Sequence, residues 1–181
     1  MTTEGNNEQL SVEDLREKVV QKLKANPGIK TAMLAQTLGV PEVAVIRVLP
    51  DDRSKELDDS KMEELIKDIE HLGLVYLVVR NPAVVSETRG VFGGFSKSGP
   101  FVNVAGNNIH VHLMLANFKF AFSVTVPGSD DSPPMYSLQF FQPSGIAAMK
   151  IFVIERMKKE AGFDFQESAK KFHELTEKYL K

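Results

Sequence analysis

The sequence has 181 residues, 43% of them apolar and 25% charged, which is typical of a soluble globular protein and too apolar for a disordered chain. Its formal net charge of −2 argues against a surface that binds nucleic acid or an anionic membrane over its whole extent. Because there is no cysteine, disulfides, thiolate metal sites and a cysteine nucleophile are excluded.

The first residues carry no targeting signal. Met1 to Leu10 is polar and slightly acidic, unlike a secretory signal or an Arg-rich transit peptide. No apolar stretch approaches the roughly 20 residues that a membrane-spanning helix needs. We therefore expect a cytoplasmic protein without membrane insertion.

The N-terminal quarter has the pattern of three short helices. Ser11 is a good N-cap for the first, which Asn26-Pro27-Gly28 ends. A second helix fits Thr31 to Leu38 and stops at Gly39, and a third runs from Pro41 to about Leu49. The tight crossing expected at the glycine makes this segment resemble a helix-turn-helix.

Binding of DNA by these helices is not favoured. A DNA-reading helix needs Arg, Lys, Asn or Gln side chains that reach base edges. The third helix offers Arg47 together with an acidic Glu42, and residues 1–50 contain six basic and six acidic residues. A structural or interaction role fits this balance better than a nucleic-acid partner.

A polar connector separates the helices from the rest of the chain. Residues 51–60 are acidic, and we expect a solvated segment there. Ser60 and Glu63 have the spacing of a capping box, and the helix that follows ends at Gly73. We accordingly expect an N-terminal helical segment over 1–59 and a sheet domain over 60–181.

From Leu74 onward the pattern changes to short strands, and Asn81-Pro82 ends the first of them. Further strands are predicted at 83–85 and 92–95, at 101–105 before a Gly106-Asn107-Asn108 turn, and as two hairpins, 109–116 with 118–126 and 136–142 with 146–154. A last helix fits 165–180. Helices, then antiparallel strands, then a helix predict an α+β fold whose sheet curls or closes.

Two histidines are the first candidate ligands. His110 and His112 share one side of a predicted strand with Met114, because successive side chains alternate. Two imidazoles and a thioether suit a metal ion or a haem iron. The alternative is an ordinary solvated strand face, and a zinc hydrolase site is weaker still because no third histidine lies nearby.

Alternating phenylalanines form the second candidate. They indicate either an ordinary sheet core or an apolar wall for a flat hydrophobic ligand. Phe92 and Phe95, set among glycines, are candidates for a mobile flap over such a wall, and these glycines lack the spacing of a nucleotide-binding loop. The ladder comprises Phe118, Phe120 and Phe122, with Phe140, Phe141 and Phe152 as expected partners.

The stretch from Ser137 to Phe152 resembles the HutX/ChuX family of cytosolic haem carriers. The resemblance rests on Phe140-Phe141, Gly145 and Lys150-Ile151-Phe152, with Gly99, Phe101 and His112 at family-like spacing. It implies a helical segment followed by an antiparallel split-barrel-like sheet, and a homodimer. It also implies a non-enzymatic protein that accepts imported haem and delivers it to haem-using or haem-degrading enzymes.

By position, the resemblance assigns His112 as the ligand of the haem iron. It also makes Phe101 a haem-binding candidate. His110 is a further candidate, and Arg80, Lys119 or Lys150 can pair with the propionates, because partly buried carboxylates need a cation. A family histidine on an upstream strand is replaced here by Arg80 or a neighbour, which leaves ligation by His112 alone, by His110 or by Tyr76 open. The alternatives are a ligand-sensing transcriptional regulator and a split-barrel haem or flavin enzyme.

Overall fold

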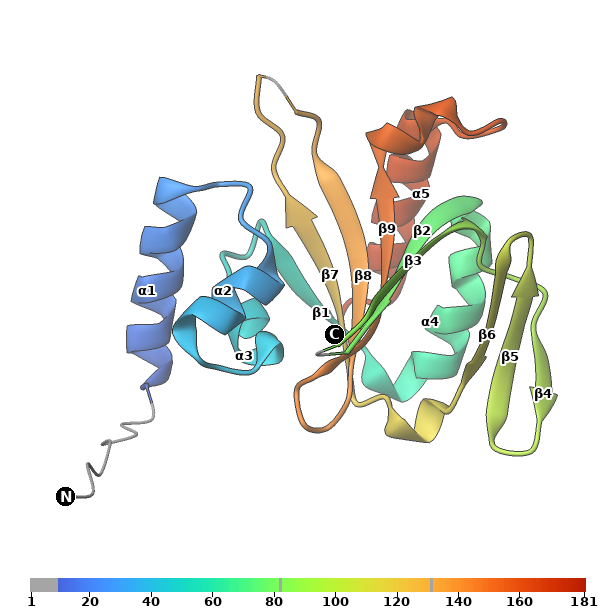
Figure 1. Ribbon diagram of the computed structural model, residues 1–181, viewed down its shortest axis with the longest axis horizontal. Coiled ribbons are helices and arrows are strands. Elements are labelled where there is room, and N and C mark those ends of the chain that lie inside the picture. Colours follow the sequence, from blue (N-terminus) through green and yellow to red (C-terminus); the bar gives the residue numbers. More distant parts are fainter. Residues whose placement is uncertain (1–9, 82, 131) are drawn as a thin grey trace.

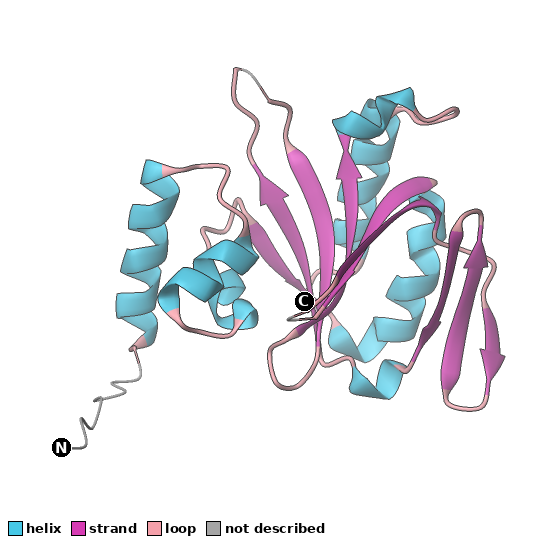
Figure 2. Cartoon of the chain, viewed as in Figure 1, coloured by secondary structure: helices cyan, strands magenta, loops and turns pink. Residues whose placement is uncertain are grey.

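The computed structural model has three N-terminal helices, two antiparallel sheets, a helix between the first two strands and a C-terminal helix (Figures 1 and 2). The structure describes residues 10–81, 83–130 and 132–181, so the polar N-terminal segment before Leu10 and the strand-breaking Pro82 lie outside the described residues. The mixture of helices with antiparallel strands confirms the α+β prediction.

The N-terminal helices form a unit that we call the head. It consists of α1 (Val12–Ala25), α2 (Thr31–Leu38) and α3 (Glu42–Arg47). As predicted, the Ser11 side chain caps α1 by accepting the Asp14 N–H, and α2 ends at Gly39, whose φ of 67° favours glycine. The third helix is shorter than expected because it stops at Arg47.

The larger sheet has six strands in the order β1-β7-β8-β9-β2-β3. Its hairpin of β8 with β9 confirms the prediction. The three-stranded sheet has the order β4-β5-β6, and β5 and β6 join through the predicted Gly106-Asn107-Asn108 turn. The strands are β1 (Ser54–Leu57), β2 (Leu74–Arg80), β3 (Val85–Val91), β4 (Ser96–Ser98), β5 (Phe101–Gly106), β6 (Ile109–Leu113), β7 (Phe120–Val126), β8 (Met135–Phe141) and β9 (Ala147–Ile154).

The predicted hairpin between 109–116 and 118–126 is wrong. β6 pairs with β5 in the small sheet, whereas β7 pairs with β1 and β8 in the large one. The short 3-10 helix η3 (Leu115–Asn117) carries the chain from one sheet to the other. A period of two predicts that a segment is a strand, but it does not say which strand will be its neighbour.

The acidic connector is also not a loop throughout. Its residues Ser54–Leu57 form β1, which pairs with β7 and buries Leu57 completely. The expected capping box at Ser60 is absent, because the Ser60 N–H and hydroxyl both donate to Asp58 instead. This cap begins η1 (Asp59–Lys61), which leads into α4 (Met62–Asp68) and η2 (Ile69–Leu72).

The expected flap does not exist. The segment from Phe92 to Phe95 is not a strand, and Phe92 is fully buried in the main core with Phe95 packed against its ring edge. Strand β3 extends to Val91, well beyond the predicted 83–85. Two aromatic rings gain more by leaving water for the core than by covering a ligand from outside.

The large sheet has two faces with different partners. The helices α4 and α5 (Phe165–Lys178) cover one face, called here the helix-side face, and enclose the main core with it. The head packs at the β1 edge of the other face, called here the head-side face, around Phe122 and Phe141. After β9 the chain passes through η4 (Glu155–Lys159) to α5.

The aromatic ladder is divided between these two faces. Phe122 and Phe141 belong to the head-side core, whereas Phe140 lies in the main core with Phe118 against it. Phe152 packs instead against Tyr76. Phe118, Phe122, Phe140 and Phe141 therefore serve as ordinary core residues on two faces, while Phe152 is partly buried, and the set forms no continuous wall.

Candidate functional site

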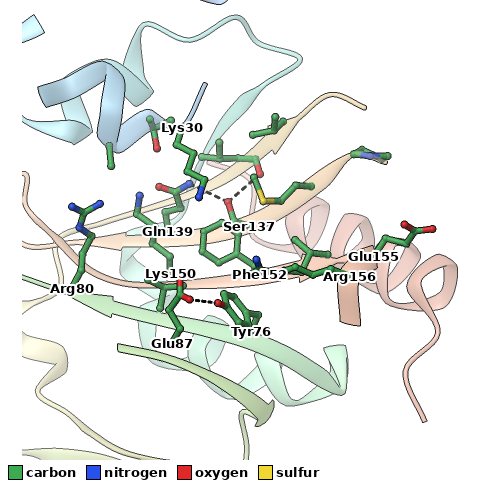
Figure 3. A pocket seen from close by; sticks show the side chains of 18 of the residues that line it. Lys30, Tyr76, Arg80, Glu87, Ser137, Gln139, Lys150, Phe152, Glu155 and Arg156 are labelled. Atoms are coloured by element: carbon green, nitrogen blue, oxygen red, sulfur yellow. Dashed lines mark hydrogen bonds between the residues drawn. The ribbon is translucent and has the colours of Figure 1, made fainter. Parts of the chain in front are cut away.

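The first depression lies between the head and the head-side face of the large sheet (Figure 3). This head–sheet cavity has a volume of about 490 Å³, within the usual range for ligand sites. Its apolar floor comes from alternate residues of neighbouring strands, and cations stand around it. The lining includes Lys30 and Thr31 at the start of α2, Tyr76, Val78, Arg80, Glu87, Val124, Met135, Ser137, Gln139, Lys150, Phe152, Glu155 and Arg156.

Strand alternation places these side chains. Tyr76, Val78 and Arg80 point the same way from β2, while Lys150 and Phe152 stand beside them on β9. The register pairs Val78 with Lys150 and Tyr76 with Phe152. The apolar and cationic groups are therefore fixed by the rigid strands, which hold side chains more accurately than loops do.

A buried ion pair stands in the wall of this cavity. Lys150 is 6% exposed, and its Nζ lies 2.5 Å from Oε1 of Glu42. The Thr31 hydroxyl donates to the same carboxylate oxygen at 2.5 Å. Burial lowers the pKa of the Lys150 ammonium, and Glu42 offsets only part of that effect.

A second polar group is buried without a complete set of partners. Gln139 is 3% exposed; its Nε2 donates to the Ser137 hydroxyl at 3.0 Å, which in turn donates to the Val124 carbonyl. Among the described residues, no donor reaches Gln139 Oε1. A buried acceptor without a donor is costly, so this atom is a point of low stability beside the cavity.

Tyr76 occupies the end of the cavity near Arg156. Its hydroxyl donates to Glu87 at 2.5 Å, and the Arg156 guanidinium lies 4.3 Å from its ring centre. Burial raises the pKa of Tyr76, and the hydrogen bond to Glu87 raises it further. The phenol thus stays protonated at neutral pH, and a phenolate ligand for iron is disfavoured here.

The second depression lies between β2 and β9 of the large sheet and β6 of the small sheet. This His groove has a volume of about 540 Å³ and is lined by apolar side chains together with His110 and His112. The His112 Nδ1 lies 2.6 Å from Oδ1 of Asn103, which fixes that nitrogen as the donor and leaves Nε2 free to accept. The two imidazole rings lie 5.1 Å apart, and the Phe101 ring packs edge-on to His112.

The predicted site residues therefore fall into two separate places. Arg80 and Lys150 line the head–sheet cavity, whereas His110 and His112 line the His groove, and Phe101 stands beside His112. Strands β2 and β9 divide the two, because Val78 faces the cavity and Leu77 faces the groove. One flat ligand cannot touch both sets within a single chain.

Sequence reasoning missed two groups of the head–sheet cavity. Glu42 carries no local signal for this role, because its contact with Lys150 joins residues 108 positions apart. Ser137 and Gln139 do carry a signal, since two polar residues spaced by two on one face of a buried strand need a polar partner.

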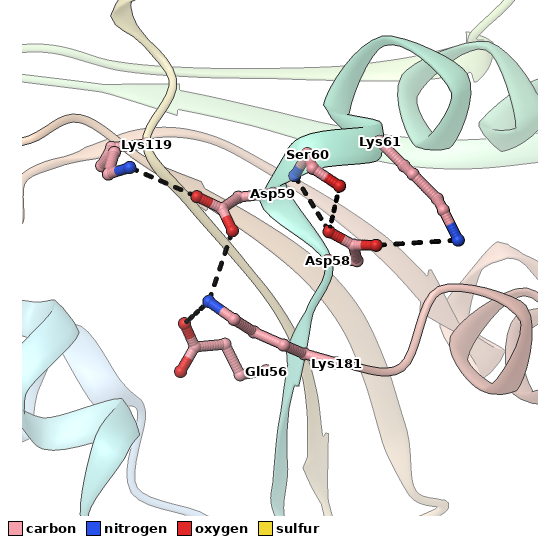
Figure 4. Close-up of polar contacts among 7 residues, drawn as sticks. All are labelled: Glu56, Asp58, Asp59, Ser60, Lys61, Lys119 and Lys181. Carbon is pink, nitrogen blue, oxygen red and sulfur yellow. Dashed lines mark hydrogen bonds and ion pairs between the residues drawn. The ribbon is translucent and has the colours of Figure 1, made fainter.

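The acidic residues of the connector form a structural cluster and not a binding site. Lys181 reaches Glu56 at 3.2 Å and Asp59 at 3.3 Å, and Lys119 also binds Asp59 (Figure 4). These pairs tie the C-terminus to the start of the sheet domain. Within residues 10–81, 83–130 and 132–181, no group of three or more His, Asp or Glu side chains is placed to hold a metal ion.

Acid should weaken this tie. The hydrogen bond from Lys181 is the main reason that the pKa of Asp59 lies below its ordinary 3.8. Since the folded-state pKa is the lower one, this stabilisation is present above pH about 4 and is lost as the pH falls through the folded value. We expect the melting temperature of Asp59→Asn to fall less than that of the wild type between pH 5 and pH 3. Glu174→Gln is the control, because the Glu174 carboxylate lies 3.8 Å from Lys170 on an exposed helix face. Its melting temperature should fall with pH as much as that of the wild type.

Comparisons with known proteins identify a matching family. Residues 55–175 match the model of the family described as "Haem utilisation ChuX/HutX". The sequence is 24% identical over 152 residues to "Intracellular heme transport protein HutX" of Vibrio cholerae serotype O1, an alignment covering 83% of this chain and 78% of the relative.

Solved structures share the fold. "Crystal structure of ChuX" superposes with a TM-score of 0.73 at 21% identity, covering 91% of this chain and 96% of that one. The heme-binding protein holo-PhuS from Pseudomonas aeruginosa gives a TM-score of 0.78 at 20% identity, covering 95% of this chain but 46% of that longer chain. In the part of the chain that the structure describes, no helix has the length and apolar character needed to cross a membrane.

Proposed function

This chain belongs to the haem utilisation ChuX/HutX family, and from that premise we propose that it is an intracellular haem carrier. It accepts imported haem in the cytoplasm and delivers it to haem-using or haem-degrading proteins, without catalysing a reaction itself. The name of the Vibrio cholerae relative and the heme-binding structural neighbour support this role. A homodimer is part of the same proposal.

The observation that carries the proposal is the chemistry of the head–sheet cavity. Its floor of Val78, Val124 and Phe152 suits an apolar macrocycle, and Arg80 and Lys150 suit two propionates. Lys30 and Arg156 add positive charge at its margins. The donor set thus fits a flat, dianionic, largely apolar ligand.

The head–sheet cavity offers no imidazole to the haem iron, because no histidine is among the described residues that line it. Ligation by His112, which its family position suggests, is the alternative to the cavity placement. Its support is the free Nε2 that the contact with Asn103 leaves in the His groove. Haem would then lie in the His groove and not in the cavity, so the two placements exclude each other for one molecule of haem.

In this proposal the helix-turn-helix-like head is a cover for a split-barrel-like sheet and not a DNA reader. The buried residues of α3, which are Val43, Val45 and Ile46, pack in the head-side core. Arg47, the base-reading candidate, holds its guanidinium 4.4 Å from the ring centre of Phe120. The helix that would read DNA is thus engaged with the sheet.

Titration with hemin tests both the function and the placement. We expect a saturable Soret band for the wild type. Because Arg80 faces a propionate in the cavity, Arg80→Ala should weaken binding about 5-fold, the value of one partly exposed charge-assisted contact. If the iron is bound by His112, His112→Ala should instead shift or remove the Soret band.

Two results would contradict the proposal. The absence of any saturable band in the wild type would exclude a haem carrier. Loss of the band after a reductant and oxygen are added would indicate a haem-degrading enzyme instead of a carrier.

A further inference from the structure

The Glu42–Lys150 pair stands where a cargo carboxylate would bind. Lys150 projects from the middle of β9 into the head–sheet cavity, and Glu42 approaches it from the first turn of α3. Their side chains are 8% and 10% exposed, so water screens the contact weakly. The cation that suits a propionate thus already holds a protein carboxylate.

The same carboxylate attaches the head to the sheet. Besides Lys150 of the sheet, Glu42 accepts the hydroxyl of Thr31 from α2. Next to it, the Val43 N–H points to the Gly145 carbonyl in the β8–β9 turn at 3.5 Å. Movement of Glu42 would therefore change how the head sits on the cavity.

The charge around Lys150 favours another anion. Arg80 and Lys30 lie near enough to lower the pKa of Lys150 further, after the larger effect of burial. Lys150, Arg80 and Lys30 thus place positive charge together on the cavity lining, and Glu42 pairs with Lys150. Two carboxylates on one ammonium repel each other in a site of low dielectric, so an arriving carboxylate and Glu42 cannot share it without loss.

We propose that Glu42 is an internal competitor of the cargo: it holds Lys150 in the empty carrier, a carboxylate of the porphyrin displaces it, and its return promotes release. This inference rests on the proposed function with haem in the head–sheet cavity, and it adds the regulation of that site. It assigns Glu42 to the control of affinity, because its carboxylate pairs with a cation that lines the cavity and that a propionate would use.

The test compares hemin binding and release in matched variants. Glu42→Gln keeps the shape but removes the charge, so we expect hemin to bind about 10-fold more tightly and to pass about 10-fold more slowly to apomyoglobin, a change of about 1.4 kcal/mol. Glu155→Gln removes the same charge from the cavity margin away from Lys150, and its gain should stay below about 3-fold. Hemin dimethyl ester, which has no carboxylate, should bind wild type and Glu42→Gln equally.

A second variant covers the case in which Glu42→Gln does not fold. Glu42→Asp keeps the charge but shortens the reach to Lys150, and an intermediate gain of about 3-fold is expected. Wild-type binding with no gain in either Glu42 variant would overturn this inference alone. An equal gain for the ester or for Glu155→Gln would also overturn it, whereas a wild type that binds no hemin would overturn the proposed function as well.

Discussion

Replacing Lys150 with methionine is expected to weaken hemin binding about 30-fold and to lower the free energy of unfolding by about 3 kcal/mol. The loss of affinity follows because a charge-assisted hydrogen bond is worth roughly 1.5–3 kcal/mol. The loss of stability follows because Glu42, 10% exposed, would keep its charge without its cation. Urea unfolding of the ligand-free protein and hemin titration measure the two effects separately.

The double variant Lys150→Met with Glu42→Leu separates binding from folding. A buried ion pair replaced by apolar residues of similar volume is often neutral for stability. We therefore expect the free energy of unfolding to return to within about 1 kcal/mol of the wild type, while hemin binding stays weak. Recovery of full hemin affinity in the double variant would show that Lys150 is not a partner of the cargo.

Gly106→Ala should lower the free energy of unfolding by about 3 kcal/mol, which is at the upper end of the cost of overpacking. The residue lies at the seam, which is the set of backbone contacts between the large and the small sheet. There the Val91 N–H donates to the Asn107 carbonyl at 3.0 Å, and the Ala105 N–H donates to Gly93 at 3.0 Å. A Cβ at Gly106 would lie 1.9 Å from the Val91 carbonyl oxygen, which is backbone and cannot turn away. The small sheet must then shift.

This shift of the small sheet would also change the His groove, because β6 carries His110 and His112. Gly28→Ala is the control, because the nearest atom to its added Cβ lies 3.8 Å away, and its stability should stay within about 0.5 kcal/mol of the wild type. Chemical denaturation measures both variants. Wild-type stability in Gly106→Ala would mean that the seam yields more easily than its backbone contacts suggest.

Several elements could be predicted because their signals are local. Ser11 and Gly39 mark helix ends through their own hydrogen bonds and backbone angles. Alternation predicted that His110 and His112 share one side of a strand, which the structure confirms, since both are exposed while Ile109 and Leu113 on either side of them are buried. The C-terminal helix lies where the apolar stripe predicted it.

Most of the wrong predictions concern which strands lie beside one another, and fewer concern where the helices and strands occur in the sequence. Alternation predicted the strand Phe120–Val126 but not its partners, and the acidic residues of the connector concealed β1. Because strand order was not predicted, the division of the candidate site between two depressions was not predicted either. Arg80 and His112 were expected to bind one ligand, but their side chains lie on opposite sides of the β2 and β9 strands.

The sequence by itself determined the α+β class, the three-helix head, the hairpin of β8 with β9, the turn at 106–108 and the family, since these depend on periodicity, turn residues and short motifs. Tertiary structure alone decided that Glu42 meets Lys150, that no donor among the described residues reaches Gln139 Oε1, and that the cations and imidazoles occupy different depressions. The physical reason is that a period of two fixes which face of a strand a side chain occupies, whereas strand order and the docking of the head fix what that face meets.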